Sequence, residues 1–106
     1  MSINKIYIPD KGVCRVSFTL PESAANHSEK VSVVGDFNSW NPDINRMERD
    51  NNGQFKCIID LPLGKVYEFR YLIDDSQWVN EWDADAYSPT PYDGEYNMIL
   101  SCINPV

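Results

Sequence analysis

Apolar and polar residues alternate along several short stretches of this chain, and a period of two residues is typical of β-strands that are buried on one face. Val13–Leu20 follows this pattern throughout, and Val66–Asp74 is the longest stretch that does so. Further strands are expected at 31–34, 47–49, 54–61 and 95–100. No stretch has a convincing 3.6-residue period. We therefore predict an all-β sandwich of about seven antiparallel strands.

Chain length and turn residues set the expected domain boundaries. The 106 residues allow one domain. Residues 1–12 are predicted to form an irregular lead-in along a sheet edge, and residues 13–103 the single sandwich domain. Residues 80–94 are expected to form a loop, and His27 lies in a polar loop that we place on the surface.

The balance of charge disfavours several classes of partner. Nine Lys and Arg against 16 Asp and Glu give a formal net charge of −7. Nucleic acids and anionic membranes bind clustered cations, so neither is expected as a partner, whereas a neutral sugar remains compatible. No apolar run approaches the roughly 20 residues that span a bilayer. The first residues lack the apolar region of a signal peptide, so a cytoplasmic location is expected.

The residue types that usually carry metal or catalytic chemistry are poorly spaced. Cys14, Cys57 and Cys102 are odd in number and far apart, which predicts reduced thiols in apolar surroundings rather than disulfides or a zinc site. Asp83-Ala84-Asp85 begins like a calcium loop, but the later oxygen ligands and the glycine are missing. A nucleophile elbow, an HExxH motif and a phosphate-binding glycine loop are also missing. We therefore expect no metal, no cofactor and no enzymatic activity.

The stretch from Val31 to Trp40 begins as a β-branched strand and ends in a polar turn. Gly35 is expected to supply a backbone conformation that other residues avoid. Two aromatic residues, Phe37 and Trp40, lie inside this turn. Either Phe37 closes the core while Trp40 stays at the rim as a platform for a ligand, or both rings cover the core.

Five aromatic residues fall in expected loops or at strand ends rather than at alternating strand positions: Trp40, Trp78, Trp82, Tyr87 and Tyr92. Amide and carboxylate side chains stand beside them. Flat rings next to hydrogen-bonding groups suit a pyranose, which has apolar faces and a polar equator. The alternative is that some of these rings pack loops onto the end of the sandwich, and the sequence leaves both interpretations open.

Two stretches together closely resemble a known family. They are Val33-Val34-Gly35-Asp36-Phe37-Asn38-Ser39-Trp40, and Tyr67-Glu68-Phe69-Arg70-Tyr71-Leu72-Ile73-Asp74 leading to Trp78. The chain is similar, from about Val13 to Leu100, to the isoamylase early-set domain, a carbohydrate-binding module of family 48. That module precedes the catalytic barrel of glycogen branching and debranching enzymes and occurs in the β subunit of AMP-activated protein kinase. The resemblance is to the short bacterial form that stands alone, and it implies an immunoglobulin-like fold.

The resemblance also implies a binding site for α-1,4-glucans such as glycogen, starch and maltodextrins. Trp40 and Trp78 match the two tryptophans that hold the glucan in the family, and Arg70 matches a lysine that bonds sugar hydroxyls. In the late loop Asn97 and Gly94 fit the family pattern. Asp93 and Glu95 depart from it, and Tyr92 is the residue that replaces the usual aliphatic wedge.

Two functions follow from these observations. The leading hypothesis is non-catalytic binding of an α-glucan through surface tryptophans. The alternative is a protein-interaction module that docks on a glycan-metabolising enzyme and has a degenerate sugar site.

Overall fold

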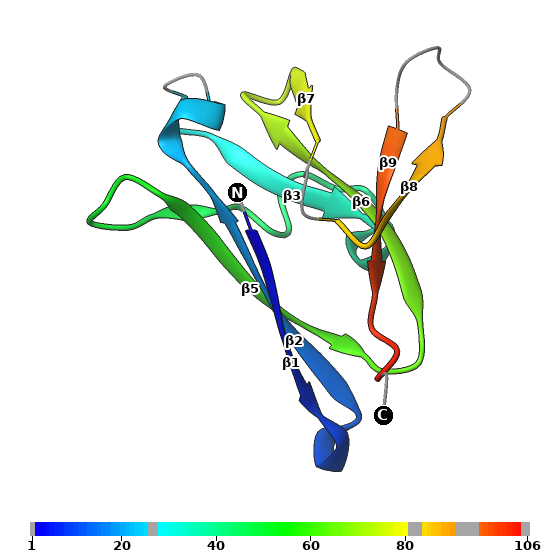
Figure 1. Cartoon of the computed structure of the whole chain (residues 1–106). Coiled ribbons are helices and arrows are strands. Elements are labelled where there is room, and N and C mark those ends of the chain that lie inside the picture. Colours follow the sequence, from blue (N-terminus) through cyan, green and yellow to red (C-terminus); the bar gives the residue numbers. More distant parts are fainter. Residues whose placement is uncertain (1, 26–27, 81–83, 91–95, 105–106) are drawn as a thin grey trace.

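The computed structural model describes residues 2–25, 28–80, 84–90 and 96–104. They form two antiparallel sheets packed face to face (Figure 1). The first sheet has the order β1 (Ser2–Ile8), β2 (Val13–Leu20), β5 (Phe55–Pro62) and β4 (Glu48–Arg49). The second sheet has the order β3 (Val31–Gly35), β6 (Val66–Ile73), β9 (Tyr96–Ser101) and β8 (Ala86–Pro89), and β7 (Gln77–Val79) also pairs with β6. The predicted all-β sandwich is confirmed.

The core lies between the two sheets and is built from the alternating positions. Every second residue of β2 is buried, and the inward residues of β6 are buried as well. Two outward residues of β6, Arg70 and Leu72, are also buried. The Phe18 ring of β2 meets the rings of Phe69 and Tyr71 on β6 edge to face, with centroids 5.3 Å and 6.3 Å away. Each such side chain contributes about 1.5–3 kcal/mol when it is fully buried. The alternation of apolar and polar residues therefore predicted correctly which face of each strand points into the core.

Two strands lie where none was expected. Residues 2–8 form β1, which pairs with β2 along its whole length, from Ser2 opposite Thr19 to Ile8 opposite Val13. The irregular lead-in was therefore a wrong prediction, because the backbone of β2 provides a partner that the pattern of residues 1–12 does not reveal. β8 lies within the expected loop 80–94 and pairs with β9 at the sheet edge. With β1, β8 and the short β7, which also lies outside the stretches named above, the described residues contain nine strands rather than about seven.

One edge of β6 is shared by two strands, and this arrangement positions the site described below. β3 pairs with one edge of β6, from Gly35 opposite Phe69 to Val31 opposite Ile73. On the other edge β9 pairs with residues 66–69 and β7 pairs with residues 71–73. Arg70 lies at the junction between β9 and β7.

The free edge of β3 is covered by the chain that leaves it. The Val33 N–H donates to the Asn45 carbonyl at 2.9 Å, and the Met47 N–H donates to the Val31 carbonyl at 2.8 Å. The chain then crosses to the first sheet at β4. On the opposite side of the sandwich Lys5 of β1 forms an ion pair with Asp85, the residue before β8. The two sheets are thus joined along both sides.

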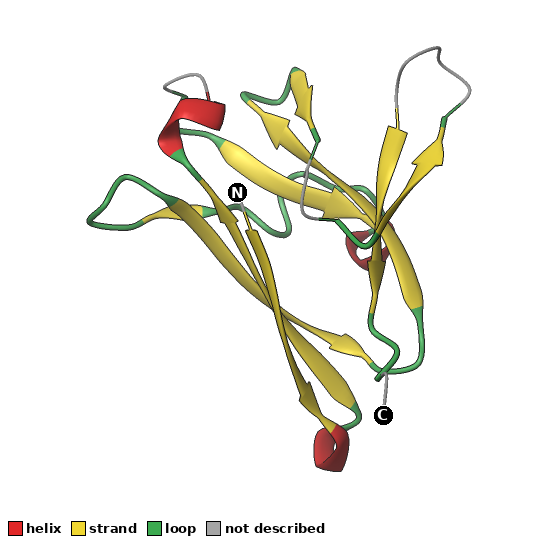
Figure 2. Cartoon of the chain, viewed as in Figure 1, coloured by secondary structure: helices red, strands yellow, loops and turns green. Residues whose placement is uncertain are grey.

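The helical segments among the described residues are single 3-10 turns at Pro9–Lys11, Glu22–Ala25 and Asp36–Asn38 (Figure 2). In this part of the chain no helix has the length and apolar character needed to cross a membrane. Cys14 and Cys102 are buried and Cys57 is partly buried, and all three are free thiols. Burial and the adjacent Cys14 raise the pKa of Cys102 to about 12.

Candidate functional site

The turn after β3 depends on the close approach of Gly35 to β6. A Cβ atom at Gly35 would lie 2.5 Å from the Glu68 carbonyl oxygen and 2.8 Å from the Phe69 Cβ. The φ angle of Gly35 is −171°, which any residue adopts. The expectation that this glycine supplies an unusual backbone conformation is therefore wrong, because it is the space beside β6 that excludes a side chain.

A buried amide closes the same turn. The Asn38 Oδ1 accepts a hydrogen bond from the Gly35 N–H at 3.1 Å. The Asn38 Nδ2 donates to the Val33 carbonyl at 2.9 Å and to the Asn45 Oδ1 at 2.8 Å. A side chain that makes three such bonds while only 5% exposed fixes the backbone around it. The turn is therefore a rigid support for the residues that follow.

The two aromatic residues of this turn have different places. The Phe37 ring packs against the core, with its centroid 6.4 Å from that of Phe18 and 6.1 Å from that of Tyr67. Trp40 is partly buried but does not join the core cluster of the described residues. Of the two alternatives raised by the sequence, the structure agrees with the one in which Phe37 closes the core and Trp40 lies at the rim.

Trp40 is held in an unusual conformation. Its φ angle is +57° and that of Ser39 is +56°. The left-handed region costs a residue with a Cβ roughly 1–2 kcal/mol. The Trp40 N–H donates to the Gly35 carbonyl at 3.0 Å, and its indole Nε1–H donates to the Asp36 Oδ1 at 3.1 Å. Backbone strain of this kind is concentrated at functional sites.

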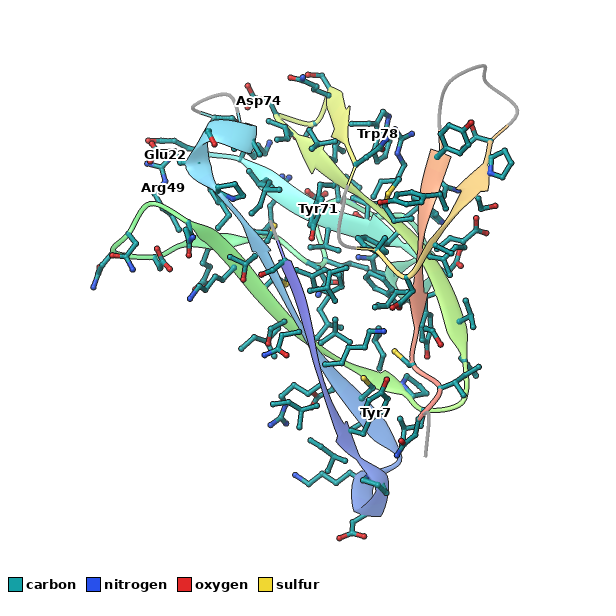
Figure 3. All side chains as sticks on the ribbon, in the orientation of Figure 1. Tyr7, Glu22, Arg49, Tyr71, Asp74 and Trp78 are labelled. Carbon is teal, nitrogen blue, oxygen red and sulfur yellow. The ribbon has the colours of Figure 1, made fainter. Side chains whose placement is uncertain are left out.

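Trp78 lies on the outer face of the second sheet. It stands opposite Leu72 in the ladder between β6 and β7, and 41% of its surface is exposed. Figure 3 shows Trp78 near β7, whereas Tyr71 lies in the middle of the molecule. The Arg70 guanidinium carbon lies 5.2 Å from the centre of the Trp78 ring. The Arg70 Nη2 also donates to the Asn80 Oδ1 at 3.3 Å.

Asn97 on β9 belongs to the same outer face. Its neighbour Met98 pairs with the core residue Phe69, so the next positions in the register, Arg70 and Asn97, both face outward. Arg70, Trp78 and Asn97 thus come together from β6, β7 and β9. This polar and aromatic group is called the Arg70 cluster below.

Trp40 is linked to β6 through Asp36. Asp36, which bonds the Trp40 indole, also accepts a hydrogen bond from the Glu68 backbone N–H at 2.8 Å. Glu68 lies two residues before Arg70 on β6, so the link reaches the strand that carries the Arg70 cluster. Tyr92 and Gly94, the remaining predicted site residues, lie outside the described residues, as do Asp93, Glu95 and Trp82.

The sequence interpretation did not assign Asp36 to the site, and it placed Asn80 only beside the aromatic residues, without its contact with Arg70. Asp36 counted only as a turn former, and its position directly after the strand-ending Gly35 and four residues before Trp40 was the available signal. Asn80 follows β7 by one residue, and nothing in its local sequence links it to Arg70. The link between Asn80 and Arg70 depends on how β6 and β7 pair, which a single sequence does not specify at this precision.

A network of charges holds the hairpin between β6 and β7. Asp75 in the hairpin turn forms ion pairs with Lys30 at 2.5 Å and Arg46 at 3.2 Å. The hydrogen bond from Lys30 is the main cause that lowers the pKa of Asp75, and Arg46 adds to it. Arg46 also binds Asp43 in the loop after Trp40 at 2.7 Å. The loops that carry Trp40 and Trp78 are therefore connected through one arginine.

Other surfaces offer less to a ligand. A groove of about 490 Å³ is lined by Arg46, Glu48, Arg49, Asp50, Lys56, Cys57 and Ile58. Its cations already have internal partners, since Lys56 pairs with Asp50 at 3.4 Å and the Arg49 guanidinium lies 5.1 Å from the Phe55 ring centre. The described part of the chain holds no group of three or more His, Cys, Asp or Glu suited to a metal ion.

Comparison with known proteins gives one matching family and several relatives. A family model described as the glycogen recognition site of AMP-activated protein kinase matches residues 24–102. The 1,4-alpha-glucan-branching enzyme 1, chloroplastic/amyloplastic, of Pisum sativum is 28% identical over 107 residues, which cover 81% of this chain and 13% of the enzyme. The 1,4-alpha-glucan branching enzyme of Synechocystis sp. is 26% identical over 76 residues, which cover 71% of this chain and 9% of the enzyme. That of Nitrosomonas eutropha is 45% identical over 47 residues, which cover 42% of this chain and 6% of the enzyme. The chain thus spans only a small part of these relatives.

Proposed function

The chain belongs to the family described as the glycogen recognition site of AMP-activated protein kinase, and on this basis we propose that it binds α-1,4-glucans without catalysing a reaction. Glycogen, starch and maltodextrins are the proposed ligands. The observation that supports the proposal most strongly is the Arg70 cluster, in which an exposed tryptophan stacks on a nearly buried guanidinium. The branching enzymes that it resembles act on α-glucans as their names state, and the chain resembles only a short part of each.

In the proposed mode of binding, the Trp40 and Trp78 rings cover the apolar faces of glucosyl units. Each contact removes on the order of 50–100 Å² of apolar surface from water, which contributes roughly 1–2 kcal/mol. Arg70 and Asn97 donate hydrogen bonds to sugar hydroxyls. Tyr92 and Gly94 complete the proposed site.

The spacing of the two tryptophans favours an oligosaccharide over a single sugar. Asp36 bonds both the Trp40 indole and the Glu68 N–H, which places Trp40 near Glu68 along β6. Trp78 pairs with Leu72 of the same strand. Glu68 and Leu72 are four residues apart, which corresponds to roughly 13 Å along a strand. We therefore propose that the two rings contact different units of one glucan chain.

Co-sedimentation with glycogen tests this function. The wild-type protein should pellet with the polysaccharide, and soluble maltoheptaose should release it. Trp78→Ala should remain in the supernatant, whereas Ile58→Ala, a substitution of a side chain 65% exposed on the first sheet, should pellet like wild type. Equal pelleting of Trp78→Ala and wild type would show that the proposed face is wrong.

A second function has support from another surface. Ile6 and Ile58 are 55% and 65% exposed on the outer face of the first sheet. They flank the ion pair between Arg15 and Asp60, which lies on the same face. Two exposed isoleucines on one sheet face support, as the second proposal, a docking module for a glycan-metabolising enzyme. In that case Ile58→Asp should abolish association with the enzyme, and the wild type, whose sugar site would be degenerate, should not pellet with glycogen.

A further inference from the structure

We infer that Asp36 is a positioning residue that sets the orientation of the Trp40 indole for the ligand. The inference rests on the proposed function and adds a residue to it. The two carboxylate oxygens of Asp36 have separate tasks. Oδ1 accepts the Trp40 Nε1–H at 3.1 Å, and Oδ2 accepts the Glu68 N–H at 2.8 Å.

The bond to Glu68 fixes the carboxylate to the sheet. The ladder between β3 and β6 ends with Gly35 opposite Phe69. The Asp36 side chain receives the next N–H of β6, so it continues the pairing by one bond beyond the last backbone pair. A carboxylate anchored to a strand in this way holds its second oxygen at a fixed place.

The bond from the Trp40 indole to this carboxylate then fixes the orientation of the ring relative to the sheet. The backbone of Trp40 is in the left-handed region, with φ +57°, and the preceding Ser39 has the same strain. The backbone of Trp40 is held by the bond from its N–H to the Gly35 carbonyl. The bond between Nε1 and Oδ1 therefore restricts the ring in a way that the backbone does not.

The exposure of Asp36 to solvent argues that it positions the Trp40 ring rather than stabilising the core. Asp36 is exposed, so its carboxylate is not required to satisfy a buried group. A ring that is ordered before the ligand arrives loses less conformational freedom on binding. Loss of the bond should therefore weaken glucan binding by about fivefold to tenfold.

A double-mutant cycle with Asp36→Ala and Trp40→Phe tests the link. Phenylalanine keeps an aromatic face and lacks the Nε1–H, so it removes the bond without removing the platform. In a calorimetric titration with β-cyclodextrin, Asp36→Ala should weaken binding about fivefold to tenfold in the wild-type background and by less than about twofold in the Trp40→Phe background. Fully additive effects would overturn the inference. Asp10 is an exposed carboxylate in the Pro9–Lys11 turn, far from this bond in the sequence. The Asp10→Asn variant therefore controls for the change of net charge.

A second measurement needs no ligand. In nuclear magnetic resonance spectra, the indole N–H of Trp40 should exchange with solvent more slowly in the wild type than in Asp36→Ala, and Asp36→Asn should be intermediate because its Oδ1 can still accept one bond. Identical exchange in all three proteins would overturn the inference even if the wild type binds glucan. Absence of glucan binding by the wild type, with a protected indole N–H, would instead refute the proposed function and retain the positioning of the ring.

Discussion

The guanidinium of Arg70 lies against one face of the Trp78 ring, 5.2 Å from its centre. Arg70 is only 8% exposed, whereas Trp78 is 41% exposed. A planar guanidinium and an indole attract each other by about 0.5–2 kcal/mol, more when water is excluded. The stack therefore holds the ring over the sheet, and it leaves the surface of the ring turned away from Arg70 for a ligand.

Substitution of Arg70 tests whether the stack matters for binding. Arg70→Met keeps the apolar stem and removes the planar charge, so we expect glucan binding to weaken roughly tenfold. Arg70→Lys keeps a charge but not the planar fork, and it should weaken binding by about threefold. The measurement is the dissociation constant for maltoheptaose, with thermal unfolding as the control for folding. Unchanged binding by Arg70→Met would remove Arg70 from the proposed site.

Gly35→Ala should destabilise the fold because the new methyl group meets the backbone of β6. The cost of such overpacking is about 1–3 kcal/mol, and here the obstructing Glu68 carbonyl cannot rotate away. Gly12→Ala is the matched control, because it has a φ of +65° but no atom within 4 Å of an added Cβ. That variant should cost about 1–2 kcal/mol from backbone strain alone. Urea unfolding measures both, and a smaller loss for Gly35→Ala than for Gly12→Ala would contradict this account.

Asn38→Asp should also destabilise the turn. The aspartate can still accept from the Gly35 N–H, but it cannot donate to the Val33 carbonyl or the Asn45 Oδ1. It would place a buried charge beside two oxygens, so we expect a loss of about 2–4 kcal/mol in the free energy of unfolding. Chemical denaturation at neutral pH measures it. Recovery of stability when the carboxyl group is protonated at lower pH would identify the charge as the cause.

Stability should fall in acid because three aspartates have lowered pKa values in the folded state. A hydrogen bond from Arg15 lowers the pKa of Asp60. A hydrogen bond from Lys30 lowers the pKa of Asp75 in the same way. The pKa of Asp50 is lowered by a hydrogen bond from the Gln54 N–H. Their ordinary pKa is 3.8. The unfolded chain therefore takes up these protons at a higher pH than the folded chain, so the stabilisation is complete well above 3.8 and is lost as the pH falls below it.

Thermal unfolding between about pH 7 and pH 2 measures this dependence. The melting temperature should decline most steeply below about pH 4, and Asp60→Asn should reduce the decline. A melting temperature that stays constant across this range would contradict the assigned ion pairs.

The parts of the fold that depend on the alternation of apolar and polar side chains could be predicted from the sequence. The buried face of β2 followed from alternation. The separate positions of Phe37 and Trp40 were one of two alternatives that the sequence left open. β1 and β8 were missed because each is an edge strand whose formation depends on a neighbour, β2 or β9, rather than on its own pattern.

In the candidate site, too, some residues could be predicted from the sequence and others could not. Trp40, Trp78, Arg70 and Asn97 were named from the resemblance, and strand register then explains how Arg70, Trp78 and Asn97 share one face. The contact of Asp36 with Glu68 could not be predicted, because it joins a turn to a strand 32 residues away. The contact with Trp40 is local, and only the spacing of four residues hinted at it. Tyr92 and Gly94 remain predictions.

The most direct test of the central claim is a calorimetric titration of the wild type, Trp40→Ala and Trp78→Ala with β-cyclodextrin and maltoheptaose. The account predicts saturable binding by the wild type in the micromolar to low millimolar range. It predicts that either substitution abolishes binding while thermal unfolding shows an intact fold, because both rings lie outside the core. Folded variants that bind both ligands as the wild type does, or a folded wild type that binds neither at several millimolar, would contradict it.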